Sequence, residues 1–237
     1  MKRLIALLAL ALALVSTGSA RADETAPTKL KLRDDFWYHV AASPLYAWLA
    51  VFTHETSHAL AAEAVGVPVS RFEPYPGWDP EPQPNGHRRW HYGIVYYGRG
   101  YYTNDQLTTA NVAPYVVQPV VFAGSDLALS YMDKDGLPAA ITYFAGMAWQ
   151  WVFFAKDVND YHEDSDLSKV ERNGLMSRPT RVIVGNALVL VGAWRLYARG
   201  KDVLVRRVPA APPPATIVSV TPLAIPNGFG LGAFGIF

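Results

Sequence analysis

The chain has 237 residues, enough for one full domain with a sizeable core, and its formal net charge is +1. No basic cluster follows one face, so we expect no nucleic-acid partner. Cysteine is absent, which excludes disulfides and thiolate metal sites, so any transition-metal ligands must be His, Asp or Glu. Hydrophobic residues make up 51% and charged residues only 17%, a balance that favours a membrane environment, although the mean hydropathy of +0.08 is modest for a multi-spanning protein.

The first residues have the pattern of a secretory signal peptide. Lys2 and Arg3 precede an apolar run at residues 4–15, and Ala20-Arg21-Ala22 forms a small-residue cleavage pattern. We therefore predict a signal peptide over residues 1–22 and a bacterial cell-envelope protein, the alternative being an uncleaved anchor helix. The remaining chain divides into a main domain at residues 23–207 and a C-terminal segment at residues 208–237.

Four long apolar segments predict the architecture of the main domain. They lie at residues 36–65, 107–131, 139–155 and 182–198, each close to the length that spans a bilayer. Pro44 predicts a kink or a helix start after Ser43, and Gly66 predicts the end of the first segment. We expect a mainly α, polytopic helical bundle in contact with membrane lipid, in the bacterial inner membrane and multi-pass.

Two stretches outside these helices have the character of β-hairpins. After the first helix, residues 67–104 contain strand-forming runs at 69–75 and 91–97, separated by a turn-rich stretch at 76–86. Near the C-terminus, a Pro/Ala linker at 209–214 precedes two short runs at 216–225 and 229–237. These patterns predict a hairpin insertion after the first helix and a short C-terminal hairpin.

The first apolar segment contains the motif H-E-x-x-H, formed by His54, Glu55 and His58. Residues four apart share a helix face, so both histidines can direct a ring nitrogen at one Zn²⁺, with Glu55 beside a metal-bound water as general base. Charged and polar groups after a long apolar run are costly unless they are paired or bound to metal. The motif therefore predicts zinc as cofactor, with His54 and His58 as ligands.

A third protein ligand is expected far downstream in the chain. The extended zincin pattern fails, because Ala61 and Ala64 occupy the positions of its glycine and third histidine. The acid-rich stretch after the third apolar segment is the best donor, and Asp160 is the favoured ligand, with Asp157 and Asp166 as alternatives. The regular spacing of an EF-hand is missing there, so calcium is not expected.

The order of these features resembles the site-2 protease family of intramembrane metalloproteases. The resemblance rests on the apolar helix with His54-Glu55-Thr56-Ser57-His58-Ala59, on Gly66 closing it, on the β-rich loop, and on a later apolar segment that ends near an aspartate. It covers roughly residues 36–200 and implies His54, His58 and Asp160 as zinc ligands and Glu55 as base. The family's Asn-Pro-Asp-Gly-like or Leu-Asp-Gly context is replaced here by Val158-Asn159-Asp160-Tyr161.

We therefore expect zinc-dependent hydrolysis of a peptide or membrane-protein substrate at or within a membrane, with Glu55 activating the water. Two alternatives stay open at this point. One is a non-catalytic helical envelope protein, whose histidines bind metal structurally or not at all. The other is a soluble periplasmic H-E-x-x-H metalloprotein, whose apolar segments are buried as core helices.

Overall fold

The computed structural model describes residues 28–79, 86, 88, 90–209, 219–225 and 228–234. The predicted signal peptide at residues 1–22 lies outside the described residues. The chain separates into two compact units. The described part of the first unit lies within residues 32–206 and contains every described helix and the β-rich loop. The second unit consists of residues 22–31 and 207–237.

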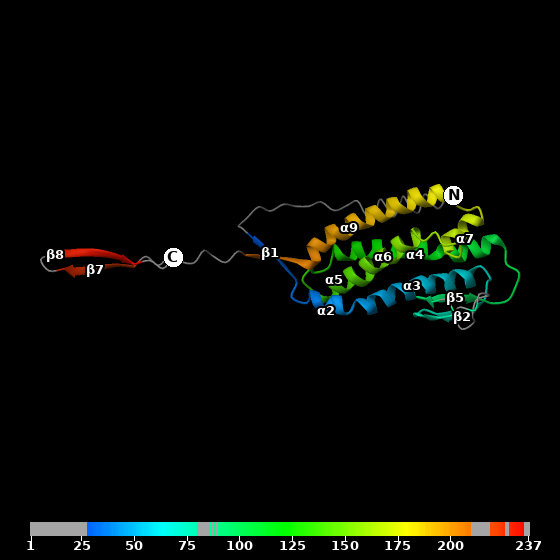
Figure 1. Cartoon of the computed structure of the whole chain (residues 1–237), viewed down its shortest axis with the longest axis horizontal. Helices are drawn as coiled ribbons and strands as arrows, with labels where there is room; N and C mark the ends of the chain where they lie inside the picture. The colour runs from blue at the N-terminus through cyan, green and yellow to red at the C-terminus, as the bar shows by residue number, and fades with distance from the viewer. Residues whose placement is uncertain are drawn as a thin grey trace. The chain divides into compact units, whose positions relative to one another are not determined.

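The first unit is a bundle of long helical rods (Figure 1). Its helices are α2 (Phe36–Ala41), α3 (Ser43–Ala64), α4 (Asn104–Leu129), α5 (Leu137–Ile141), the π-helix η1 (Thr142–Ala148), α6 (Trp149–Val158), α7 (Asp166–Arg172), α8 (Arg178–Thr180), the π-helix η2 (Arg181–Gly185) and α9 (Asn186–Leu204). Because α5, η1 and α6 follow one another without a gap, as do α8, η2 and α9, all four predicted apolar segments are helical. The third and fourth are longer than expected, whereas the first is divided into α2 and α3.

Proline and glycine set the helix limits that the sequence predicts. Pro44 lies in the first turn of α3, where its missing N–H is no loss, and a break at Ala42 separates α2 from α3. Gly66 ends α3 with a positive φ of 81°, a left-handed conformation that glycine adopts readily. The Val67 N–H then donates to the Ala62 carbonyl at 2.8 Å, which closes the helix with a Schellman-type bond.

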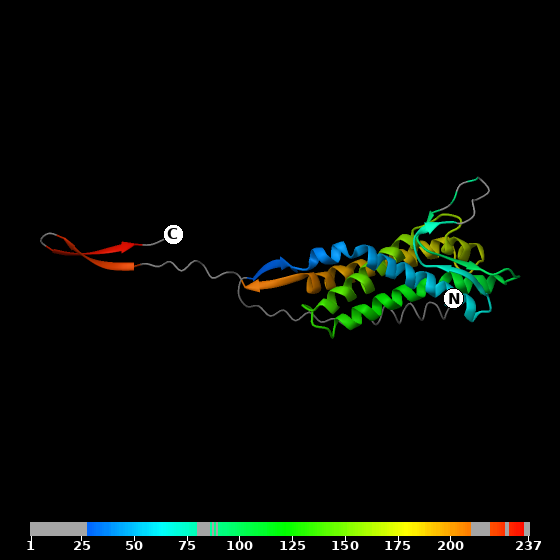
Figure 2. The same ribbon diagram turned by 90° about the horizontal axis from the view of Figure 1, so that it is seen from below.

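The loop after α3 is a small antiparallel β-structure. Strand β2 (Val69–Glu73) pairs with β5 (Ile94–Tyr97), and β3 (Gly77–Trp78) pairs with β4 (Trp90–His91). The insertion is therefore confirmed, with an additional short pair of which β3 lies inside the stretch expected to be a turn. It lies beside α3, as the view in Figure 2 shows.

Strand β1 (Thr28–Leu32) pairs with β6 (Val205–Pro209). Strands β7 (Ser219–Ile225) and β8 (Gly228–Phe234) form the C-terminal hairpin, with an antiparallel register from Ser219 opposite Phe234 to Ile225 opposite Gly228. The hairpin expected at the C-terminus is thus present. The linker residues 210–218 lie outside the described part of the chain.

Tight packing of α4 against the rod of α5, η1 and α6 forms the main core, around Phe122, Leu129, Tyr143 and Met147. One acid lies inside this packing. Asp126 of α4 is only 3% exposed, and both carboxylate oxygens accept hydrogen bonds from Arg195 of α9, each at 2.9 Å, while Arg199 donates to the same carboxylate. A buried acid needs such partners, so Asp126 ties α4 to α9 and has a structural role.

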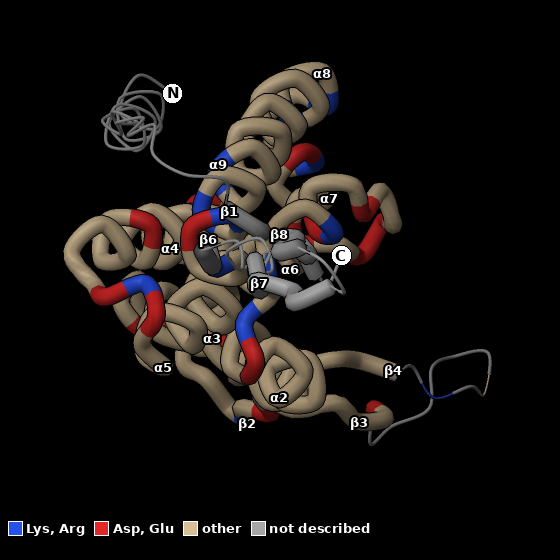
Figure 3. The backbone as a smooth tube through the Cα atoms, turned by 90° about the vertical axis from the view of Figure 1, so that its left-hand side faces the viewer, with Lys and Arg blue, Asp and Glu red and all other residues tan. Residues whose placement is uncertain are grey.

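Two of the four apolar helical rods have the length and hydropathy needed to cross a membrane. They are Asn104–Leu129 and the continuous rod Arg178–Leu204. Most of the helical residues are neither Lys or Arg (blue) nor Asp or Glu (red), as Figure 3 shows. The structure thus shows a mainly helical unit with small antiparallel sheets and two helices of membrane-spanning character.

Candidate metal centre

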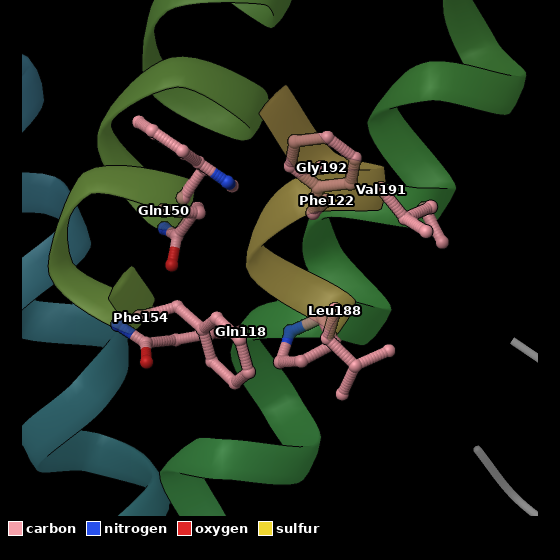
Figure 4. A pocket seen from close by; sticks show the side chains of 10 residues that line it. Gln118, Phe122, Gln150, Phe154, Leu188, Val191 and Gly192 are labelled. Atoms are coloured by element: carbon pink, nitrogen blue, oxygen red, sulfur yellow. The ribbon is translucent and has the colours of Figure 1, made fainter. Parts of the chain in front are cut away.

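Among the recesses of the described helical unit, two differ clearly in the chemistry of their linings. The smaller, of about 60 Å³, lies between α4, α6 and α9 and is lined chiefly by apolar side chains such as Phe122, Phe154 and Leu188, with the amides of Gln118 and Gln150 (Figure 4). The larger, of about 400 Å³, is lined by His54, Glu55, His58 and Asp166. Ligand sites in proteins usually measure about 300–1,000 Å³ and contain a few convergent polar groups, so the larger recess is the candidate site.

The larger recess brings together three metal-ligating side chains from two helices. His58 Nε2 lies 3.2 Å from His54 Nε2 and 3.1 Å from Asp166 Oδ2, and His54 Nε2 lies 3.9 Å from Asp166 Oδ2. Ligands at roughly 2.0–2.1 Å from a tetrahedral metal are about 3.3 Å apart. The three donor atoms therefore have the spacing that one shared metal ion requires, and these residues form a group that could hold such an ion.

Both histidines have a second contact that orients the ring. The Nδ1 of His58 lies 2.8 Å from the Ala110 carbonyl oxygen in α4, so it must be the donor. On His54, Nδ1 is buried and faces the Asp157 carboxylate at 3.4 Å, an ion-pair distance without hydrogen-bond geometry. Outer contacts of this kind hold metal-bound histidines with Nε2 towards the metal. Their presence on both rings supports the metal-site interpretation.

Asp166 is the first residue of α7, and its position depends on a buried arginine. Ser165 caps α7 by accepting from the Ser168 N–H. Arg181, only 1% exposed, donates to the carbonyl oxygens of Val158, Asp157 and Asp160. These bonds fix the loop between α6 and α7, and so place Asp166 beside the histidines.

The charge of Asp166 suits a metal ligand. Burial by itself would raise the pKa of this carboxyl group. The charge of His58, the close approach of His54 and the hydrogen bond from His58 outweigh the burial, and Lys169 adds to them, so the pKa of Asp166 lies well below its ordinary value. The side chain is therefore an anion, the form that binds metal.

The structure brings Asp166, and not the favoured Asp160, to the two histidines. Asp160 Oδ1 accepts the backbone N–H of His162 within its own turn, and its carbonyl oxygen accepts from Ser165. Asp160 lines the recess but is not one of the three converging residues. The physical reason is that the chain turns at residues 159–165 before α7 begins, so the first residue of α7, and not the first acid after α6, reaches α3.

Glu55 lines the same recess as the three converging residues and is only 8% exposed. The backbone of Gly93, just before β5, passes directly over it. A Cβ atom built at Gly93 would lie 2.6 Å from Glu55 Cγ and 2.8 Å from Val51 Cγ1, closer than non-bonded atoms approach. Only glycine lets the strand approach the Glu55 side chain so closely.

Sequence reasoning missed four residues that contribute to the site. Ala110, Asn111 and Tyr115 come from α4, where they looked like part of an ordinary apolar helix, and Arg181 looked like a loop charge. A faint indication existed for Asn111, a polar residue inside an apolar run. Nothing in the sequence marks Ala110, because it contributes only its backbone.

Comparison with known proteins does not identify a family for this chain. No family model, no curated protein and no solved structure matches the chain. The function must therefore be argued from the site itself.

Proposed function

We propose that the chain is a metal-dependent peptidase acting at or within a membrane, with zinc as its cofactor. The observation that carries the proposal is the convergence of His54, His58 and Asp166 beside a buried glutamate. The likeness of the motif and of the element order to the site-2 protease family supports it, with Asp166 in place of the family's zinc-binding aspartate.

The chemistry follows from the roles that the residues can take. When bound, zinc would make a water molecule acidic and polarise the scissile carbonyl. Glu55 would accept the proton of the attacking water and deliver it to the leaving amine, as a general base and then a general acid. Its burial in the recess keeps competing solvent away from the carboxylate.

Two groups on α4 are placed to hold the substrate carbonyl. Asn111 and Tyr115 lie one helical turn apart and both line the recess, and the Tyr115 ring contacts His54 at a centroid distance of 6.1 Å. Within the described part of the chain, no hydrogen bond engages either side chain. We assign them as donors to the oxygen that becomes negative during attack, the role of an oxyanion hole.

The substrate would be an extended peptide. Residues from Trp90 to Val95 line the recess, and β5 pairs with β2 along one edge, with no further strand on it among the described residues. An extended peptide could add to such an edge through backbone hydrogen bonds. This arrangement would hold a scissile bond next to Glu55.

A membrane setting is supported by exposed apolar side chains. On α2 and α3, Trp37, Tyr38 and Leu45 are 71%, 78% and 55% exposed, and on α9, Leu190 and Trp194 are 71% and 58% exposed. Large exposed apolar surfaces of this kind mark contact with membrane or partner. Together with the two helices of spanning character, they favour a multi-pass protein of the bacterial inner membrane whose outer surface contacts lipid.

Metal removal tests the proposal directly. Protein purified in detergent and incubated with fluorescein-labelled casein should release labelled peptides, and 1,10-phenanthroline should stop the release. Adding Zn²⁺ after removal of the chelator should restore it, whereas Mg²⁺ should not, because imidazole ligands favour zinc. Protein that binds no metal and cleaves nothing would indicate the non-catalytic envelope protein instead, and release from membranes by carbonate would indicate the soluble periplasmic metalloprotein.

The close approach of Gly93 to Glu55 makes a second prediction. We expect Gly93→Ala to reduce casein cleavage by about 10²-fold, because a displacement of the base by about 1 Å is enough for such a loss. Zinc content should stay unchanged, since the three atoms nearest to the added methyl group belong to Glu55 and Val51 and not to the ligands. Gly124→Ala in α4 is the control, because its Cβ would meet open space; equal activity of the two variants would contradict the prediction.

A further inference from the structure

Pro114 interrupts the hydrogen-bond ladder of α4 directly beside the metal centre. In an α-helix, each carbonyl oxygen accepts the N–H of the residue four positions later. Proline has no N–H, so the carbonyl of Ala110, four residues before Pro114, has no such partner. Pro114 is fully buried inside the bundle, where water cannot take the place of the missing donor.

The carbonyl that Pro114 leaves open is the one that His58 uses. His58 Nδ1 lies 2.8 Å from the Ala110 oxygen. Because a carbonyl only accepts, the proton must be on Nδ1, which leaves the lone pair of the neutral ring on Nε2. Nε2 is the atom that faces His54 Nε2 at 3.2 Å and Asp166 Oδ2 at 3.1 Å.

We propose that Pro114 is a positioning residue for metal binding. By withholding one N–H, it reserves the Ala110 carbonyl for His58 and thereby fixes the ring orientation and the tautomer of that ligand. The inference rests on the proposed metal site but not on peptide cleavage. It also explains why a helix packed in the bundle contains a residue that costs it a backbone hydrogen bond.

The same helix provides a matched control in Pro119. Its missing N–H leaves the carbonyl of Tyr115 without its helical partner, and no side chain of the described residues donates to that oxygen. Both prolines are inside α4, where each removes one helical N–H donor. Only Pro114 is connected to a ligand.

The experiment compares zinc affinity of the detergent-purified full chain and of Pro114→Ala and Pro119→Ala, by competition with a chromogenic chelator. We expect Pro114→Ala to bind zinc about 10–100-fold more weakly, the loss typical of a missing outer contact, and Pro119→Ala to bind as the unaltered chain does. The ¹⁵N shifts of His58 should also change from the Nδ1–H tautomer to a mixture in Pro114→Ala alone.

A chemical rescue separates the N–H from the proline ring. Lactic acid at position 114, placed by nonsense suppression, removes the ring as alanine does but supplies no N–H, so it should restore the affinity. Unchanged affinity in Pro114→Ala, an equal loss in Pro119→Ala, or failure of the rescue would each overturn the inference. If the unaltered chain binds no zinc, the proposed metal site itself fails, which is a distinguishable result.

Discussion

Glu55→Gln is expected to keep its zinc and lose its peptidase activity. Glutamine preserves the shape of the side chain but cannot take a proton from water, and general acid–base catalysis contributes about 10²–10⁴-fold. We expect cleavage of labelled casein to fall by about 10³-fold or more. The metal content should remain near that of the unaltered chain, because Glu55 is not among the three converging ligands.

Glu63→Gln is the matched control for this result. Glu63 belongs to the same helix but is exposed, and Gly66 ends α3 soon after it. The control should keep both zinc and activity. Full activity in Glu55→Gln would exclude Glu55 as the base, and loss of zinc in that variant would mean that Glu55 helps to hold the metal.

The parts of the fold that could be predicted from the sequence depend on local patterns. Apolar runs of helical length predicted the four helical segments, and Gly66 predicted the end of α3. The structure shows Gly66 there with a positive φ. The H-E-x-x-H spacing placed His54 and His58 on one helix face, and their Nε2 atoms do converge. Each of these features is decided within a few turns of chain.

The features that could not be predicted depend on contacts between distant segments. The two π-helical stretches, η1 and η2, leave no pattern in composition, and nothing in the sequence indicates that Arg181 would fold the acidic loop around its side chain. The carbonyl of Ala110 is likewise a property of the packed helix pair. Sequence reasoning limited the third ligand to a short acidic stretch and could go no further, because the choice depends on where α7 begins.

Three single substitutions would show which acid is the third zinc ligand, through their effects on zinc affinity. We expect Asp166→Asn to weaken zinc binding by more than about 100-fold, since it removes the only anionic ligand of the group. Asp157→Asn should weaken binding by about 10-fold, because it removes the charge that faces His54 Nδ1. Asp160→Asn should bind zinc as the unaltered chain does, because its carboxylate accepts a bond within its own turn.

The order of these losses decides between two ways of completing the site. If Asp166 is the ligand, the losses follow the distances to the histidines, and casein cleavage should fall with the metal content in the same order. If the loop instead closes onto the metal through its first acids, Asp160→Asn would lose zinc and Asp166→Asn would keep it. The 3.1 Å contact between Asp166 Oδ2 and His58 Nε2 favours the first outcome. Arg181 holds the loop between α6 and α7 in that conformation through the carbonyl oxygens of Asp157 and Asp160. It would therefore support metal binding without contacting the ion.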